Sequence, residues 1–179
     1  AQFLPDPRCT HAVVVGIAPE PTEKNPNPHP PIFVLGGMDN DENDLEDVWV
    51  SHDRGVTWQD VYRGKRVPAP WVPGLYDAPE HRRGSVEDNG FGPRSFHSAV
   101  FVPPRDRASR RGTILVIGGA RGDSALSSVY RSDDSGKTWT AAPGASRFGQ
   151  RCQHTAAVTV SGPSDSQERR VYIIGGTRG

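Results

Sequence analysis

One eight-residue stretch occurs twice in this chain of 179 residues, and it constrains the fold more than any other feature. The first copy, residues 51–58, reads Ser-His-Asp-Arg-Gly-Val-Thr-Trp, and the second, residues 132–139, reads Ser-Asp-Asp-Ser-Gly-Lys-Thr-Trp. The shared positions are Ser51, Asp53, Gly55, Thr57 and Trp58 in the first copy and Ser132, Asp134, Gly136, Thr138 and Trp139 in the second. A match this detailed indicates a chain built from repeats.

The shared residues are typical of a tight turn between two strands. An Asp carboxylate can accept backbone N–H bonds, Gly tolerates positive φ, and Ser and Thr hydroxyls can close the turn. Alternating apolar residues precede each copy, and the final Trp offers a large apolar surface. Each copy therefore predicts a β-hairpin whose Trp packs between units, and we expect truncation of Trp58 or Trp139 to Ala to cost about 3–5 kcal/mol.

Three longer segments align around these turns. Each starts with Arg-x-x-His and runs through two apolar stretches to Gly-Gly, and the separation from His to the first Gly is 25, 21 and 21 residues. The apolar stretches are short, β-branched and bounded by Gly or Pro, so they predict buried strands. A full unit then has four strands: one after Arg-x-x-His, one ending in Gly-Gly, one carrying Trp49 or Tyr130, and one beginning at Trp58 or Trp139.

Four-stranded units repeating on this scale predict an all-β chain with a β-propeller fold. The 20 glycines and 17 prolines agree with many short strands joined by turns. We expect unit one at 8–60, a long inter-blade loop at 61–92, unit two at 93–150 and a truncated unit three at 151–179. These supply about two and a half blades, whereas propellers close with four to eight. We therefore expect the rest of a longer propeller chain as a partner, and a native mass near 19.4 kDa would contradict this.

The combination of Arg-x-x-His, apolar-Gly-Gly and a downstream Trp resembles the kelch repeat. The usual kelch turn before the Trp is here replaced by a turn that resembles the Asp-box of sialidases (the BNR type) and other propeller proteins. In that family the box is structural and lies away from the active site. The resemblance therefore implies structural rather than catalytic roles for Asp53 and Asp134, and it favours an extracellular, secreted location.

Three arginines, Arg8, Arg94 and Arg151, occupy the same repeat position. In kelch propellers the first strand is innermost, so the resemblance implies that these side chains line one mouth of a central channel. Three guanidiniums there could grip a carboxylate or sulfate. The alternative, favoured because the position repeats in every unit, is that each arginine ties adjacent blades together through backbone carbonyls. The equally repeated His11, His97 and His154 are expected to be structural for the same reason.

The loop at 61–92 carries most of the remaining binding chemistry. It contains Trp71 and Tyr76 among several arginines and prolines. Loops of this length are usually functional or disordered, and the aromatic residues favour an ordered loop over one face of the propeller. Trp71 and Tyr76 are therefore candidate ligand-binding residues, because exposed aromatics beside Arg suit sugar stacking or an interface hot spot.

The segment 39–47 holds six acidic residues. Its opening, Asp39-x-Asp41-x-Asn43, resembles the start of an EF-hand loop, but Asp44 stands where Gly is needed and Val50 where Glu is needed. A solvated loop without a cofactor is the expectation, and calcium held in another geometry is the alternative.

Two further features have structural explanations. Cys9 and Cys152 sit at equivalent positions two units apart, too far for a disulfide unless they lie close to the axis, so two buried free thiols are expected. The redox compartment is therefore undecided. The tripeptide Arg121-Gly122-Asp123 matches an integrin-type motif, but it lies in a repeated loop position and is expected to be ordinary loop sequence.

Two functions stay open. The first is a non-catalytic propeller scaffold, a binding module that presents its loops to a protein or glycan. The alternative is a glycoside hydrolase similar to sialidases, which would need an arginine cluster, a Tyr–Glu nucleophile pair and an Asp acid/base. Tyr76 and Glu80 lie in the long loop, but their spacing matches no such motif, so binding is preferred. The zero net charge gives no reason to expect a nucleic-acid partner, and no apolar run approaches the ~20 residues that span a bilayer.

Overall fold

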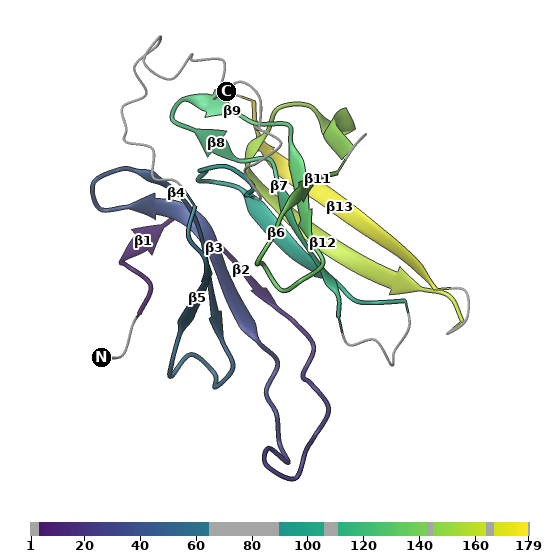
Figure 1. The fold of residues 1–179 in the computed structure, drawn as a ribbon. Coiled ribbons are helices and arrows are strands. Elements are labelled where there is room, and N and C mark those ends of the chain that lie inside the picture. The colour runs from purple at the N-terminus through teal and green to yellow at the C-terminus, as the bar shows by residue number, and fades with distance from the viewer. Residues whose placement is uncertain (1–3, 65–89, 106–110, 143–144, 164–166, 179) are drawn as a thin grey trace.

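The computed structural model describes residues 4–64, 90–105, 111–142, 145–163 and 167–178. In these residues the chain is all-β, with several antiparallel sheets and one short 3-10 turn, η1 (Ala145–Phe148). Three main sheets follow one another in chain order and lie side by side, from purple through teal and green to yellow in Figure 1. The predicted all-β class is confirmed.

The first sheet is built around β3, the first of its two eight-residue strands. Its strands are β1 (Arg8–Cys9), β2 (Ala12–Val15), β3 (Ile32–Asp39), β4 (Asp44–Ser51) and β5 (Gln59–Tyr62). β3 pairs with both β1 and β2 and, on its other edge, with β4, while β5 pairs with the outer edge of β4. The β-branched and aromatic residues of β3 and β4 suit a pleated surface that is buried on both faces, whereas β2 is buried on one face only.

The second and third sheets repeat this order with fewer strands. The second holds β6 (Ser98–Val102), β7 (Thr113–Ile117), β10 (Val129–Ser132) and β11 (Thr140–Ala141), and a small hairpin, β8 (Ala120–Arg121) with β9 (Ser124–Ala125), follows β7. The third holds β12 (Cys152–Ser161) and β13 (Glu168–Thr177). The four strands predicted for a unit occur in the predicted order, although the fourth starts one residue after the Trp.

The first two sheets also share their register. Val34 of β3 lies opposite Trp49 of β4, and Val116 of β7 lies opposite Tyr130 of β10. The residue before Gly-Gly lies opposite a Val in both sheets. The aromatic residue of the third strand therefore occupies one place in both sheets, as the sequence alignment predicts.

Two apolar clusters join neighbouring sheets. The larger lies between the first and second sheets, and its buried members are Val14, Phe33, Leu35, Val48, Val50, Phe91, Ile114, Val116 and Trp139. The smaller is centred on Val100, Ile117 and Val129 of the second sheet, with Ala156, Val158 and Ile173 of the third packed against it. Burial of these side chains is the main force that holds the sheets together.

Backbone hydrogen bonds cross between the sheets at equivalent positions. The amide of Phe96 donates to the carbonyl of Thr10 over 3.1 Å, and the amide of Gln153 donates to the carbonyl of Phe96 over 2.9 Å. All three residues have positive φ, between 53° and 56°. This unusual backbone conformation for non-glycine residues is the same at each step, so one connection is used between the first and second sheets and again between the second and third.

A second set of backbone bonds uses the Gly-Gly pairs. The amide of Gly37 donates to the carbonyl of Arg94 over 3.0 Å, and the amide of Gly119 donates to the carbonyl of Arg151 over 2.9 Å. At both glycines φ is near 100°, and a Cβ would collide with the backbone of the segment that leads into β2 or β6. Glycine is therefore required for the close approach of these strands. None of the described residues belongs to a helix long and apolar enough to cross a bilayer.

Candidate functional site

The turn at residues 51–58 is organised by one carboxylate. Asp53 accepts hydrogen bonds from the Ser51 hydroxyl (2.8 Å), the Thr57 amide (2.8 Å) and the Thr57 hydroxyl (2.5 Å). The Ser51 hydroxyl oxygen accepts the Gly55 amide, and the Trp58 indole donates to the Gly55 carbonyl. The Thr57 hydroxyl and amide hold the pKa of Asp53 down at about 2. This carboxylate stays ionised near neutral pH and is occupied by the turn itself.

The turn at residues 132–139 has the same bonds. Asp134 accepts from the Ser132 hydroxyl (2.8 Å), the Thr138 amide (2.9 Å) and the Thr138 hydroxyl (2.6 Å), and Trp139 donates to the Gly136 carbonyl. Partial burial opposes ionisation, but the bonds from Thr138 and Ser132 lower the pKa of Asp134 below its usual value. Both carboxylates therefore serve as acceptors that fix a corner between two strands.

The two tryptophans that end these turns have different environments. Trp139 is only 3% exposed and packs in the larger cluster, where its ring meets Phe91 edge to face with centroids 4.9 Å apart. Trp58 is half-buried and is not part of either cluster. The prediction that both pack between units is therefore wrong for Trp58, because Trp139 uses a neighbouring sheet that Trp58 lacks among the described residues.

The three repeated arginines each donate to the carbonyl of the first glycine in their own sheet. Arg8 Nη1 donates to Gly36 over 3.1 Å, and Arg94 Nη1 donates to Gly118 over 2.8 Å. Arg151 Nη1 donates to Gly175 in the same way. Each of these bonds stays within one sheet and does not itself tie adjacent units together, and a ligand at these arginines would compete with backbone carbonyls.

The strand beside the Gly-Gly strand supplies the remaining partner of the first two arginines. Asp47 of β4 lies in a bidentate ion pair with Arg8 at 2.6 and 2.9 Å, and it also accepts the Trp49 indole N–H over 2.7 Å. The equivalent residue before β10 is Ser128, whose hydroxyl lies 3.3 Å from Arg94 Nη1. The position just before the Val that lies opposite Leu35 or Ile117 therefore provides an acceptor for the arginine in both sheets.

Arg94 is the most enclosed of the three, with 2% exposure. It donates to the carbonyls of Phe91 and Gly92 as well as to Gly118, and its guanidinium lies 5.2 Å from the centre of the Tyr130 ring. Burial is the main cause that lowers its pKa, to about 10, so it stays charged at neutral pH. A charge this deep is tolerated because nearly every donor has an acceptor.

Two of the repeated histidines are buried beside the glycine corners. His154 Nε2 lies 2.7 Å from the Ser98 hydroxyl, whereas His97 has no side-chain hydrogen-bond partner among the described residues and interacts only with the backbone of Leu35. Burial, with the Arg94 charge as a smaller cause, lowers the pKa of His97 to about 3. Burial and Arg151 lower the pKa of His154 in the same direction. The side chain of His11 is exposed.

The acidic segment forms a turn around Asp39. Its Oδ1 accepts the amides of Asp41 (3.0 Å) and Asn43 (2.9 Å), and the Asn43 side-chain amide donates to both of its oxygens. Among the described residues, no group of three or more His, Cys, Asp or Glu side chains is arranged to hold a metal ion. Calcium at Asp39, Asp41 and Asn43 stays the sequence-based alternative.

The cysteines and the Arg-Gly-Asp tripeptide take different places. Cys9 and Cys152 are free, as predicted, but the prediction that they are buried is wrong, because Cys9 is exposed and Cys152 half-buried. Arg121 donates to the Pro93 carbonyl over 3.1 Å, and the Gly122 amide donates to the buried carboxylate of Asp44 over 2.8 Å. The tripeptide is thus tied to the first sheet.

A buried glutamate that the sequence did not single out joins the two ends of the long inter-blade loop. Glu46 accepts the Gly92 amide over 2.7 Å and lies 3.4 Å from the Tyr62 hydroxyl. Gly64 and Gly90 border the same carboxylate so closely that a Cβ on either would collide with it. Tyr62 and Gly64 precede residues 65–89, and Gly90 and Gly92 follow them, so both ends of that segment meet at one side chain.

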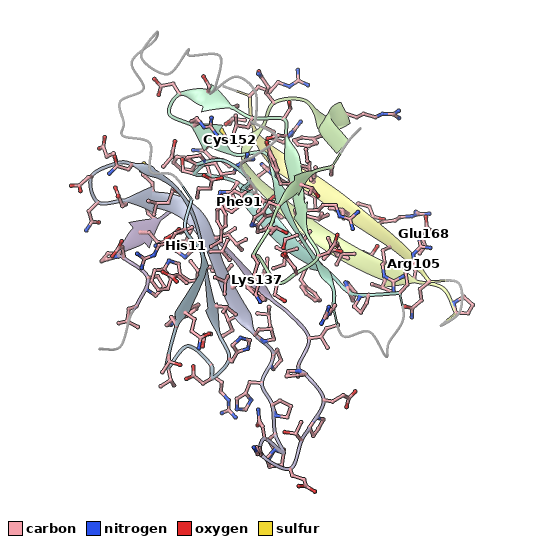
Figure 2. The ribbon with its side chains drawn as sticks, in the orientation of Figure 1. His11, Phe91, Arg105, Lys137, Cys152 and Glu168 are labelled. Carbon is pink, nitrogen blue, oxygen red and sulfur yellow. The ribbon has the colours of Figure 1, made fainter. Side chains whose placement is uncertain are left out.

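The loop's exit is fixed by an aromatic residue. Phe91 is fully buried in the larger cluster and lies near the centre of Figure 2. Trp71 and Tyr76, the candidate binding residues of this loop, lie outside the described residues. The burial of Glu46 in β4 could have been predicted only from a regular alternation of apolar and polar residues along that strand. The neighbouring acidic residues interrupt that alternation, so the sequence does not indicate it.

Comparison with known proteins identifies no relative from which a function could be inferred, so the proposal below is based on the contacts described above. No protein-family model matches the chain, and no curated protein matches it.

Proposed function

We propose that the chain is a kelch-like β-propeller scaffold with Asp-box turns, a non-catalytic binding module that presents the segment 65–89 to a protein or glycan, outside the cell. Support for the propeller comes from the sheets, which succeed one another with one register and one set of connecting backbone bonds. A constant step between four-stranded sheets is what a ring of blades requires.

The observation that carries the binding function is the closure of both ends of 65–89 on Glu46. Loops that carry recognition residues are commonly held by a rigid base, because the base lowers the entropy lost on binding. The sequence between the two ends contains Trp71, Tyr76 and several arginines, residue types enriched in binding hot spots. The scaffold therefore fixes where such a segment leaves and re-enters the sheet.

Binding is favoured over catalysis by the state of the carboxylates in the two repeated turns. Asp53 and Asp134 have lowered pKa values and are saturated by hydrogen bonds of their own turns. A general acid needs a carboxyl that holds its proton near the working pH, which these two do not. Arg8 and Arg94 are likewise bound to Asp47 and to backbone carbonyls.

The test compares the native chain with a variant in which 65–89 is replaced by a short Gly-Ser linker. Since Tyr62 and Gly92 already meet at Glu46, a short linker spans the gap without strain. On an array of sialylated and neutral glycans we expect the native chain to bind at least one glycan class and the variant to lose that binding while keeping its melting temperature. Trp71→Ala serves as a point-mutant equivalent of the loop replacement.

An activity assay on the native chain tests the alternative function, that of an enzyme. Hydrolysis of a fluorogenic sialoside by the native chain, abolished by Tyr76→Phe, would replace the binding module with a sialidase-like hydrolase. Glycan binding that survives the loop replacement would move the site away from 65–89.

A further inference from the structure

The outer edge of β13 differs from the same edge in the other two sheets. β3 and β7 each pair with a further strand there, β4 and β10 respectively, whereas β13 pairs only with β12 among the described residues. The hairpin of β12 and β13 lies at the margin of Figure 1, and Figure 2 labels Cys152 at one end of it and Glu168 at the other. A strand edge with unused N–H and C=O groups is a template for another strand.

The side chains of β13 show the same difference. Leu35 and Ile117, the residues before Gly-Gly in the first two sheets, are 0% and 1% exposed, but the equivalent Ile174 is 59% exposed. Val171 is 37% exposed, whereas the equivalent Ile114 is 1% exposed. The apolar sequence of β13 therefore matches a central strand although it lies at an edge.

Arg151 provides an independent observation. Arg8 and Arg94 each have an acceptor at equivalent positions on the neighbouring strand or directly before it, Asp47 and Ser128 respectively. Arg151 has the same bond to its glycine carbonyl, but β13 has no further neighbouring strand among the described residues to supply an equivalent of Asp47 or Ser128. Asp47 and Ser128 bind the terminal nitrogens of their arginines, so an incoming acceptor would bind the terminal nitrogens of Arg151.

Phe148 completes the comparison. It precedes Arg151 by three residues, as Phe91 precedes Arg94. Phe91 meets Trp139, which belongs to the turn after β10, whereas Phe148 packs on the smaller cluster, which contains no Trp. A Trp delivered by a turn that follows a strand on β13 would occupy the place on Phe148 that Trp139 occupies on Phe91.

We propose that the outer edge of β13 docks an extended strand-and-turn segment of the type Asp/Ser-Val-aromatic-x-Ser-x-Asp-x-Gly-x-Thr-Trp, the pattern of residues 47–58 and 128–139. The first residue accepts from Arg151, the aromatic residue lies opposite Ile173, and the Trp packs on Phe148. The register follows from β3 with β4 and from β7 with β10. This inference rests on the proposed propeller architecture, and it adds the partner's sequence chemistry and place of binding.

The test uses the full chain and a fluorescent synthetic peptide with the sequence of residues 47–58. We expect saturable anisotropy changes and at least about tenfold slower amide exchange in β13, since added strands protect the edge amides. A scrambled peptide of the same composition is the control and should give neither change. Exchange in β4 and β10, whose edges are already paired, should stay unchanged.

A paired substitution checks the contact with Arg151. The native chain should bind the Asp47→Asn peptide about five- to tenfold more weakly than the unchanged peptide, because a charge-assisted bidentate bond becomes a neutral one. An Arg151→Gln chain should bind both peptides equally. Equal binding of both peptides by the native chain would contradict the proposed register.

Two results would overturn the docking site, and both are separable from the proposed function. One is peptide binding without protection of β13, or no binding at all, while glycan binding by 65–89 persists. The other is a stable dimer of the chain that protects β13 without peptide, detected by analytical ultracentrifugation, which would make a second copy the occupant. Conversely, peptide docking by the loop-replaced variant would support the site even where glycan binding fails.

Discussion

The contact between the first and second sheets and the contact between the second and third use the same backbone bonds but bury their side chains differently. In the first contact Arg94 is enclosed by Phe91, Gly92 and Tyr130. In the second, Arg151 keeps the bond to its glycine carbonyl, but its side chain is only half-buried and Gly175 is exposed. The repeated polar motifs therefore determine the path of the backbone, whereas the burial of each arginine side chain depends on the side chains that the neighbouring strands place around it.

The largest difference between the two contacts is expected from the arginines. Arg94→Ala removes the donors for three carbonyls in a buried setting, so we expect the free energy of unfolding to fall by about 5 kcal/mol. Arg151→Ala should cost about 1 kcal/mol or less, because its partner is solvent-accessible. Urea unfolding at neutral pH measures both. Equal losses would mean that burial does not distinguish the two positions.

The tryptophans give the next largest difference. Trp139→Ala opens a cavity in the larger cluster beside Phe91 and should cost about 4 kcal/mol. Trp58 keeps the same indole bond to its turn but is half-buried, so Trp58→Ala should cost about 1–2 kcal/mol. The ratio of the two losses in denaturant unfolding measures how much the neighbouring sheet contributes beyond the turn.

The sequence was sufficient for local structure. The repeated Asp, Thr and Trp positions predicted two corners with the same form, and the apolar stretches predicted the strands and their order. These predictions succeed because turn chemistry and strand periodicity are local properties of the chain.

The sequence was insufficient where a residue's environment comes from another sheet. Trp58 and Trp139 lie in the same motif, yet only one is enclosed, and Cys9 and Cys152 proved more exposed than expected. Glu46 was not identified at all, because its role depends on Tyr62 and Gly92 arriving together after a long loop. Contacts between distant segments leave no local pattern in a single sequence.

A smaller difference is expected at the glycine corners. Gly118 and Gly175 both have positive φ, 55° and 72°, so alanine is strained at each by about 1 kcal/mol. A Cβ on Gly118 would lie 2.6 Å from the Arg151 carbonyl oxygen, whereas no atom of the described residues lies within 4 Å of one on Gly175. We expect Gly118→Ala to cost about 2–4 kcal/mol and Gly175→Ala about 1 kcal/mol. Similar melting temperatures for the two variants would contradict the close approach at Gly118.

The pH dependence of stability should report His97. Its pKa is about 3 in the folded chain, below the ordinary value of 6.5, so the unfolded chain binds the proton more readily. The stability that the neutral ring contributes is present above about pH 6.5 and is lost as the pH falls towards 3, at up to about 1.4 kcal/mol per pH unit.

Urea unfolding at about pH 7 and about pH 5.5 measures this loss, and His97→Leu should reduce the difference by about 1 kcal/mol. Asp53 does not interfere, because its lowered pKa affects stability only as the pH falls below about 4. An unchanged pH slope in His97→Leu would assign the loss to another group, such as His154.

The smallest effect on stability is expected from a single hydroxyl group, which His154 has as a partner and His97 lacks. His154 lies against Gly118 and is bonded to Ser98, which pairs with Ile117. His97 lies in the same way against Gly36, and the residue that pairs with Leu35 is Ala12. Ala12 therefore stands where a serine would give His97 its missing partner.

Ala12→Ser should raise the free energy of unfolding by about 1 kcal/mol at neutral pH, the usual value of one added hydrogen bond. The matched reverse change, Ser98→Ala, should lower it by at least as much, because it leaves His154 Nε2 unpaired in a buried site. In the double variant with His97→Leu, the gain from Ala12→Ser should vanish. A gain that persists without the imidazole would show that the serine acts on the strand and not on the histidine.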